Sequence, residues 1–89
     1  SKNRNESLRE AVTATRKEAH KAFDVLFAYL KKNPDLKVDP SPLEDVAKFC
    51  GKKEPMRKNA TAEDYIDVIV ELVADGTCNL QDVKNSLEQ

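Results

Sequence analysis

Residues 5 to 32 form an uninterrupted stretch without proline or glycine. Apolar and small side chains recur along it at alternating steps of four and three residues, at Leu8, Val12, Thr15, Ala19, Ala22, Leu26 and Tyr29. This spacing places one stripe along one side of an α-helix. Asn33-Pro34 then ends the pattern, because proline cannot donate to the preceding turn and drives the residue before it out of helical geometry. The sequence therefore predicts one long helix over about residues 5–32.

The C-terminal half of this helix is apolar on more than one side. At 100° per residue, one face holds Phe23, Leu26, Phe27 and Leu30, and a second face holds Ala22, Val25 and Tyr29. Each apolar face needs another segment or a partner protein to bury it. Either the connector at 33–41 folds back over Val25 and Tyr29, with Leu36 and Val38 as its anchors, or these two residues form an exposed patch for a partner protein.

Three shorter helices are predicted at about residues 42–50, 62–75 and 80–88. Each start shows a capping residue followed three positions later by an acid, the pattern of a capping box: Ser41 with Glu44, Thr61 with Asp64, and Asn79 with Asp82. Glycines at 51 and 76 supply left-handed stops. The expected fold is all-α: one small four-helix domain in which a long N-terminal helix packs against three shorter helices.

Composition restricts the class of protein further. The chain has 89 residues, 39% of them hydrophobic and 35% charged, which suits one domain with a single modest core. No apolar run approaches the ~20 residues that span a bilayer, so no membrane association is expected. Two cysteines do not make a disulfide framework, and reduced thiols in the cytoplasm or nucleus are the default expectation. Cys50 falls on the apolar stripe of its helix, as a small core residue would.

No catalytic, cofactor-binding or metal site is expected. Nucleophilic catalysis needs a base beside the nucleophile, and the only histidine is His20, which has Asp24 one helical turn later. Cys50, Cys78 and His20 lack the local ligand pairs of a zinc site and have no fourth ligand. A calcium loop centred on Gly76 fails because Val73 would occupy a ligand position.

Charge is distributed unevenly along the chain. Residues 1–39 carry nine Lys/Arg against six acids, whereas residues 61–89 carry one against seven. Four acids, Asp64, Asp67, Glu71 and Asp75, recur at steps of three and four, and we call them the acidic ridge. Like charges at this spacing destabilise a helix by roughly 0.2–0.5 kcal/mol per pair. Either cations of this chain fold across the acidic ridge, or it receives a basic partner protein, whose encounter the charge would accelerate.

A basic set of residues supports an alternative function. Its members are Lys52, Lys53, Arg57 and Lys58 in the loop before the third helix, and Arg16 and Lys17 on the first. Such a set suits a nucleic-acid accessory domain, for which a steep salt dependence of binding is the expected signature. A solvated basic loop explains the same residues without any ligand.

The long helix is the main reason to expect assembly. Twenty-eight residues span ~42 Å, whereas helices of about 10–15 residues reach ~15–22 Å, so three short helices cannot cover all of it. Either its Ala- and Thr-rich N-terminal half pairs with a second copy or a partner helix, or the helix breaks near residues 13–15. The expected function is a non-catalytic protein-protein interaction or assembly module, whose partner binds the acidic ridge, Val25 and Tyr29, or the long helix.

Overall fold

The computed structural model describes the backbone of residues 4–89 and the side chains of residues 16–89. It contains the long helix α1 (Arg4–Lys32), a short 3₁₀ helix η1 (Pro34–Lys37), and three shorter helices, α2 (Ser41–Phe49), α3 (Ala62–Ala74) and α4 (Leu80–Leu87). No strand occurs between residues 4 and 89. The predicted all-α fold is confirmed. α1 extends through residues 13–15 without interruption.

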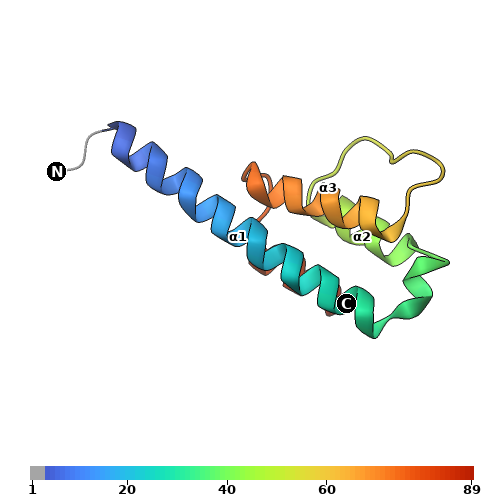
Figure 1. Cartoon of the computed structure of the whole chain (residues 1–89). Helices are drawn as coiled ribbons and strands as arrows, with labels where there is room; N and C mark the ends of the chain where they lie inside the picture. The colour runs from blue at the N-terminus through green and yellow to red at the C-terminus, as the bar shows by residue number, and fades with distance from the viewer. Residues whose placement is uncertain (1–3) are drawn as a thin grey trace.

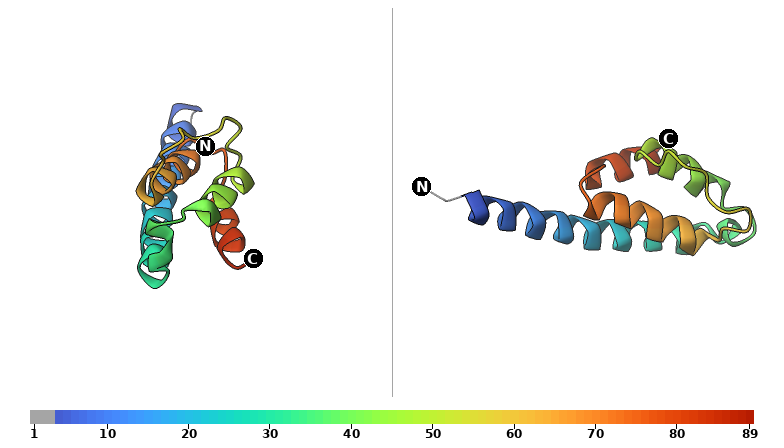
Figure 2. Two further views of the ribbon diagram at one scale, coloured as in Figure 1. Left: turned by 90° about the vertical axis from the view of Figure 1, so that its right-hand side faces the viewer. Right: turned by 90° about the horizontal axis from the view of Figure 1, so that it is seen from above.

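The four α-helices form two layers (Figures 1 and 2). α1 and α3 run antiparallel, side by side, in one layer, and α2 and α4 form the other. α1 packs mainly against α3 and also contacts α4, while α2 contacts both α3 and α4. The first turns of α1 project beyond the other helices (Figure 1), because 29 residues span about 43 Å and the 13 of α3 only about 20 Å.

The core lies between the two layers. α1 contributes its small residues Ala19 and Ala22, followed by Leu26 and Leu30, and all four are buried. The other helices contribute Leu43, Val46 and Ala47 of α2, Tyr65, Ile66, Ile69 and Val73 of α3, and Val83 of α4. The predicted stripe is therefore confirmed for Ala19, Ala22 and Leu26, and Tyr29 is half-buried against the same core. The first three residues of the predicted stripe, Leu8, Val12 and Thr15, lie outside the residues whose side chains are described.

Local capping fixes the ends of α3 and α4. Thr61 and Asn79 each accept a hydrogen bond from the backbone N–H three residues later, and the acid there accepts one in return. Gly51 and Gly76 have φ angles of +106° and +83°, which confirms the predicted left-handed stops.

The start of α2 differs from the prediction. Ser41 is not its cap. Pro40 holds the N-cap position without a side-chain hydrogen bond, and its carbonyl accepts from the N–H of Leu43 at 2.9 Å. The Ser41 N–H instead donates to Asp39 Oδ1 at 3.2 Å. The helix starts one residue early because its first turn holds Pro42, whose fixed φ is already helical and which has no N–H to satisfy.

The connector is compact where an extended segment was expected. The Leu36 N–H donates to the Asn33 carbonyl at 3.0 Å, and the resulting 3₁₀ turn directs Leu36 into the core, where it is 4% exposed. Val38, two residues further, is 90% exposed. The prediction that both residues anchor the connector is correct for Leu36 and wrong for Val38, because neighbours two apart in a 3₁₀ turn point in different directions.

Candidate protein-interaction surfaces

Two phenylalanines form an exposed aromatic pair on α1. Phe23 is 39% exposed and Phe27 41% exposed, and their rings stack with centroids 5.8 Å apart and planes 10° apart. The Lys31 ammonium lies 5.0 Å from the centroid of the Phe27 ring, within cation–π range. We call Phe23 and Phe27 the aromatic pair. The aromatic pair therefore presents apolar surface to water.

The aromatic pair is exposed because α1 can bury only one sector of its circumference. α3 and α4 cover the sector that holds Ala22, Leu26 and Leu30. Phe23 and Phe27 lie on the flank of this sector. Sequence reasoning grouped them with the core and missed them, since the spacing alone does not show where the covered sector ends.

Val25 and Tyr29, for which the sequence left open either a cover by the connector or an exposed patch, are both half-buried. Tyr29 packs against the core, and its carbonyl accepts a hydrogen bond from Asn33 Nδ2 at 2.8 Å. The exposed apolar surface of α1 is thus on the other flank of the helix from the one expected. A role for Val25 and Tyr29 in partner binding stays a prediction.

A pocket lies beside the aromatic pair where α1 meets the start of α3. It is lined by Phe27, Leu30, Lys31, Pro34, Lys37 and Glu63. The acidic side chain of Glu63, on the first turn of α3, therefore lies close to the C-terminal turns of α1. Further along α1, a second pocket is lined by cations and the histidine: Arg16, Lys17, His20 and Lys21.

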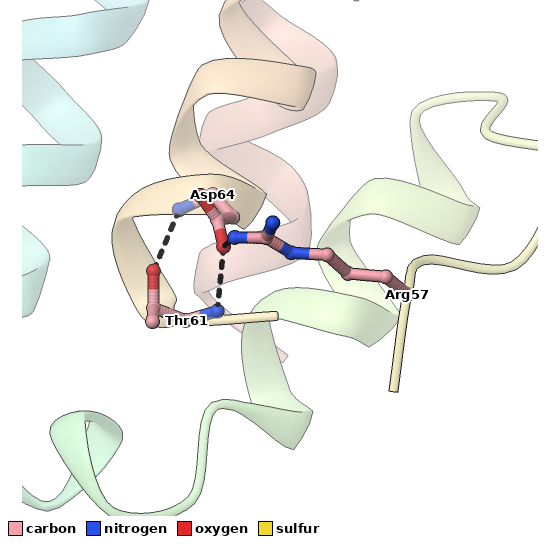
Figure 3. A network of polar contacts seen from close by, with 3 residues as sticks. All are labelled: Arg57, Thr61 and Asp64. Carbon is pink, nitrogen blue, oxygen red and sulfur yellow. Dashed lines mark hydrogen bonds and ion pairs between the residues drawn. The ribbon is translucent and has the colours of Figure 1, made fainter. Parts of the chain in front are cut away.

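The acidic ridge is satisfied at its two ends. Asp64 Oδ2 accepts hydrogen bonds from Arg57 Nη2 at 2.7 Å and from the Thr61 N–H at 3.0 Å (Figure 3). The Thr61 hydrogen bond, followed by that of Arg57, lowers the pKa of Asp64. Hydrogen bonds from Thr77 likewise lower the pKa of Asp75. Part of the ridge thus belongs to helix capping.

The middle of the acidic ridge is different. Asp67 and Glu71 are exposed, and no ion pair reaches them from any side chain between residues 16 and 89. Of the loop cations that were expected to cross the ridge, Arg57 alone pairs with it in this part of the chain. The structure therefore leaves two adjacent carboxylates of α3 available to a partner.

The basic set does not form one surface. Lys52 and Lys53 line a pocket with Tyr65 and Met56, and Arg57 is engaged by Asp64. Lys58 lines another pocket, with the connector and Thr61. Arg16 and Lys17 belong to the N-terminal half of α1, a segment that lies away from the loop (Figure 1). Nothing in this arrangement brings the six cations together.

The two cysteines are core residues. Both are buried and unpaired. Burial raises the pKa of the Cys50 thiol to about 12, and its hydrogen bond to Cys78 adds to this rise. Burial also raises the pKa of Cys78. His20 and Asp24 are exposed, and no ion pair joins them. No cluster of possible metal ligands occurs among the residues that the structure describes.

No helix in the described part of the chain combines the length and the apolar character needed to cross a membrane. Comparison with protein-family models, with curated proteins and with solved structures finds no match to this chain.

Proposed function

We propose that this chain is a non-catalytic protein-protein interaction module. The aromatic pair carries the proposal. Two stacked rings, each about two-fifths exposed, lie on the outer side of a helix whose Leu26 and Leu30 are buried. Aromatic residues are enriched at protein interfaces, where burying a ring yields transfer free energy at a low cost in side-chain entropy.

The charges around the aromatic pair support recognition of a protein. Lys31 lies over one ring, and Glu63 lines the adjoining pocket. Asp67 follows Glu63 by four residues and therefore lies on the same side of α3. A surface that combines aromatic, cationic and acidic side chains favours another mixed surface. A nucleic acid, with charge of a single sign, would be repelled by the carboxylates.

The experiment is site-specific photo-crosslinking in cells that normally express the protein. A photoreactive phenylalanine analogue replaces Phe27 in one variant and Phe49 in the control, because Phe49 is also exposed, at 51%, but lies on α2. We expect defined protein adducts at position 27 and few at position 49. The adducts at position 27 should be lost when Phe23 is also changed to Ser. Equal labelling at both positions, or none at either, would contradict the proposal.

A further inference from the structure

The outer side of the α1/α3 layer is a continuous two-helix surface. α2 and α4 lie on the inner side only, so no element between residues 4 and 89 covers the outer side (Figures 1 and 2). The surface has the aromatic pair on α1. On α3 it has the half-buried Val70 and the exposed Ala74, which follow Glu63 by seven and eleven residues and so share its side of the helix. An apolar strip thus runs between the two helices.

The two margins of this surface have opposite charge. The cationic margin, on α1, consists of Arg16, Lys17 and Lys31, and the acidic margin, on α3, of Glu63, Asp67 and Glu71; all six side chains are exposed. His20, Lys21 and Asp24 of α1 also face this side or its edge. The cations outnumber the acids on the α1 side, even with Asp24 counted. On the α3 side, the margin from residue 63 to 74 has no cation.

We propose that the partner is a second copy of this chain, bound through the outer side of the α1/α3 layer, a proposal that rests on the interaction function proposed above. The two copies are related by a two-fold axis parallel to α1 and α3. Rotation about this axis places α1 of each copy over α3 of the other. The cationic margin of each copy then meets the acidic margin of the other, and the aromatic pairs are buried between them.

The position of each residue along the helix axes, called its level below, determines which residues of the two copies meet. Lys31 and Glu63 line one pocket, so they lie at the same level. Because α1 and α3 are antiparallel, Arg16 and Glu71 both lie towards the other end. The two-fold axis preserves level, so Lys31 meets Glu63 of the second copy. At 1.5 Å per residue, Arg16 and Lys17 lie roughly 9–10 Å beyond the level of Glu71, nearest to the level of the second copy's Asp75. A partner of single charge sign would meet repulsion along one margin, which is why this surface suits its own copy.

Sedimentation equilibrium on the full chain, from about 1 µM to about 1 mM, tests the proposal. The unmodified chain should change from monomer to dimer across this range. Two variants reverse one margin each: R16E/K17E/K31E on α1, and E63K/D67K/E71K on α3. In a homodimer of either variant, margins of like charge face each other in both halves of the interface. The dissociation constant of the dimer should therefore rise at least about tenfold.

Mixing the two variants is the decisive step. In a mixed dimer the two reversed margins meet in one half of the interface and the two unmodified margins meet in the other. Opposite charges then face each other in both halves, so mixing should restore the dimer. A loss of folding or an effect within one chain would not be repaired by mixing. The control K52E/K53E/K58E carries the same change in net charge as the first variant, in the loop, and should dimerise like the unmodified chain.

Two results would overturn the proposal: a monomer throughout the concentration range, or reversed variants that do not dimerise when mixed. Both leave the interaction function open, because crosslinking at position 27 to a different protein would still support it. Adducts only to a second copy, together with rescue by mixing, would support both. An absence of adducts together with a strict monomer would refute both.

Discussion

Adjacent residues of α1 should respond very differently to truncation. Leu26 is fully buried, and Leu→Ala at such sites costs about 3–4 kcal/mol, through lost transfer free energy and the cavity that remains. Phe27 is 41% exposed, so Phe27→Ala loses only part of its burial and leaves no enclosed cavity, at a cost of about 1–1.5 kcal/mol. A domain of 89 residues has a stability of roughly 5–13 kcal/mol, so both variants should remain folded.

Urea unfolding followed by circular dichroism, at about 1 µM protein to limit association, measures both costs. Thermal unfolding gives a second measurement: at about 4–8 °C per kcal/mol, the melting temperature should fall by about 12–32 °C for Leu26→Ala and about 4–12 °C for Phe27→Ala. The denaturant m-value should not change in either variant. If Phe27→Ala is as destabilising as Leu26→Ala, the aromatic pair belongs to the core and the interaction surface on α1 does not exist.

Three further measurements test other parts of the structure. The pKa of the Asp64 carboxyl is lowered in the folded state, so Asp64 stabilises the fold fully above the ordinary carboxyl pKa of 3.8 and loses this effect as the pH falls through the lower folded-state pKa. The difference in unfolding free energy between the unmodified chain and Asp64→Ala should therefore narrow between pH 7 and pH 2.5. A constant difference would contradict the Arg57 and Thr61 contacts. Because Cys50 and Cys78 are buried with raised pKa values, iodoacetamide at pH 8 should modify neither thiol in the native protein and both in urea, as mass spectrometry will show. Asp67→Lys/Glu71→Lys should leave the melting temperature unchanged or slightly higher, since like charges are removed from an exposed face; a marked decrease would show that the middle of the acidic ridge is internal structure.

The aromatic pair and the acidic margin are exposed for the same architectural reason. A two-layer arrangement covers the inner side of α1 and α3 and leaves their outer side free. Apolar and charged side chains on that outer side add little to the stability of the monomer. Under the function proposed above, they act when another molecule covers them.

The sequence alone determined the four α-helices of this protein, although not the 3₁₀ turn at η1 or the cap of α2. The stripe through Ala19, Ala22 and Leu26 repeats at the period of an α-helix, and this period depends only on local backbone geometry. The same holds for the capping boxes at Thr61 and Asn79 and the glycine stops, which are satisfied by residues three or four positions away. The burial of Cys50 followed from its place on the apolar stripe of the helix predicted at 42–50, although Cys50 is the C-cap of α2 in the structure.

Tertiary structure decided which apolar and charged groups remain free. The sequence gives the angle between Phe27 and Tyr29 around α1, but the positions of α3 and α4 determine that the phenylalanine is exposed and the tyrosine half-buried. The path of the loop likewise selects Arg57, from four nearby cations, as the partner of Asp64. Local periodicity orders side chains around an axis, whereas coverage depends on where distant segments pack, and no spacing along the chain contains that information.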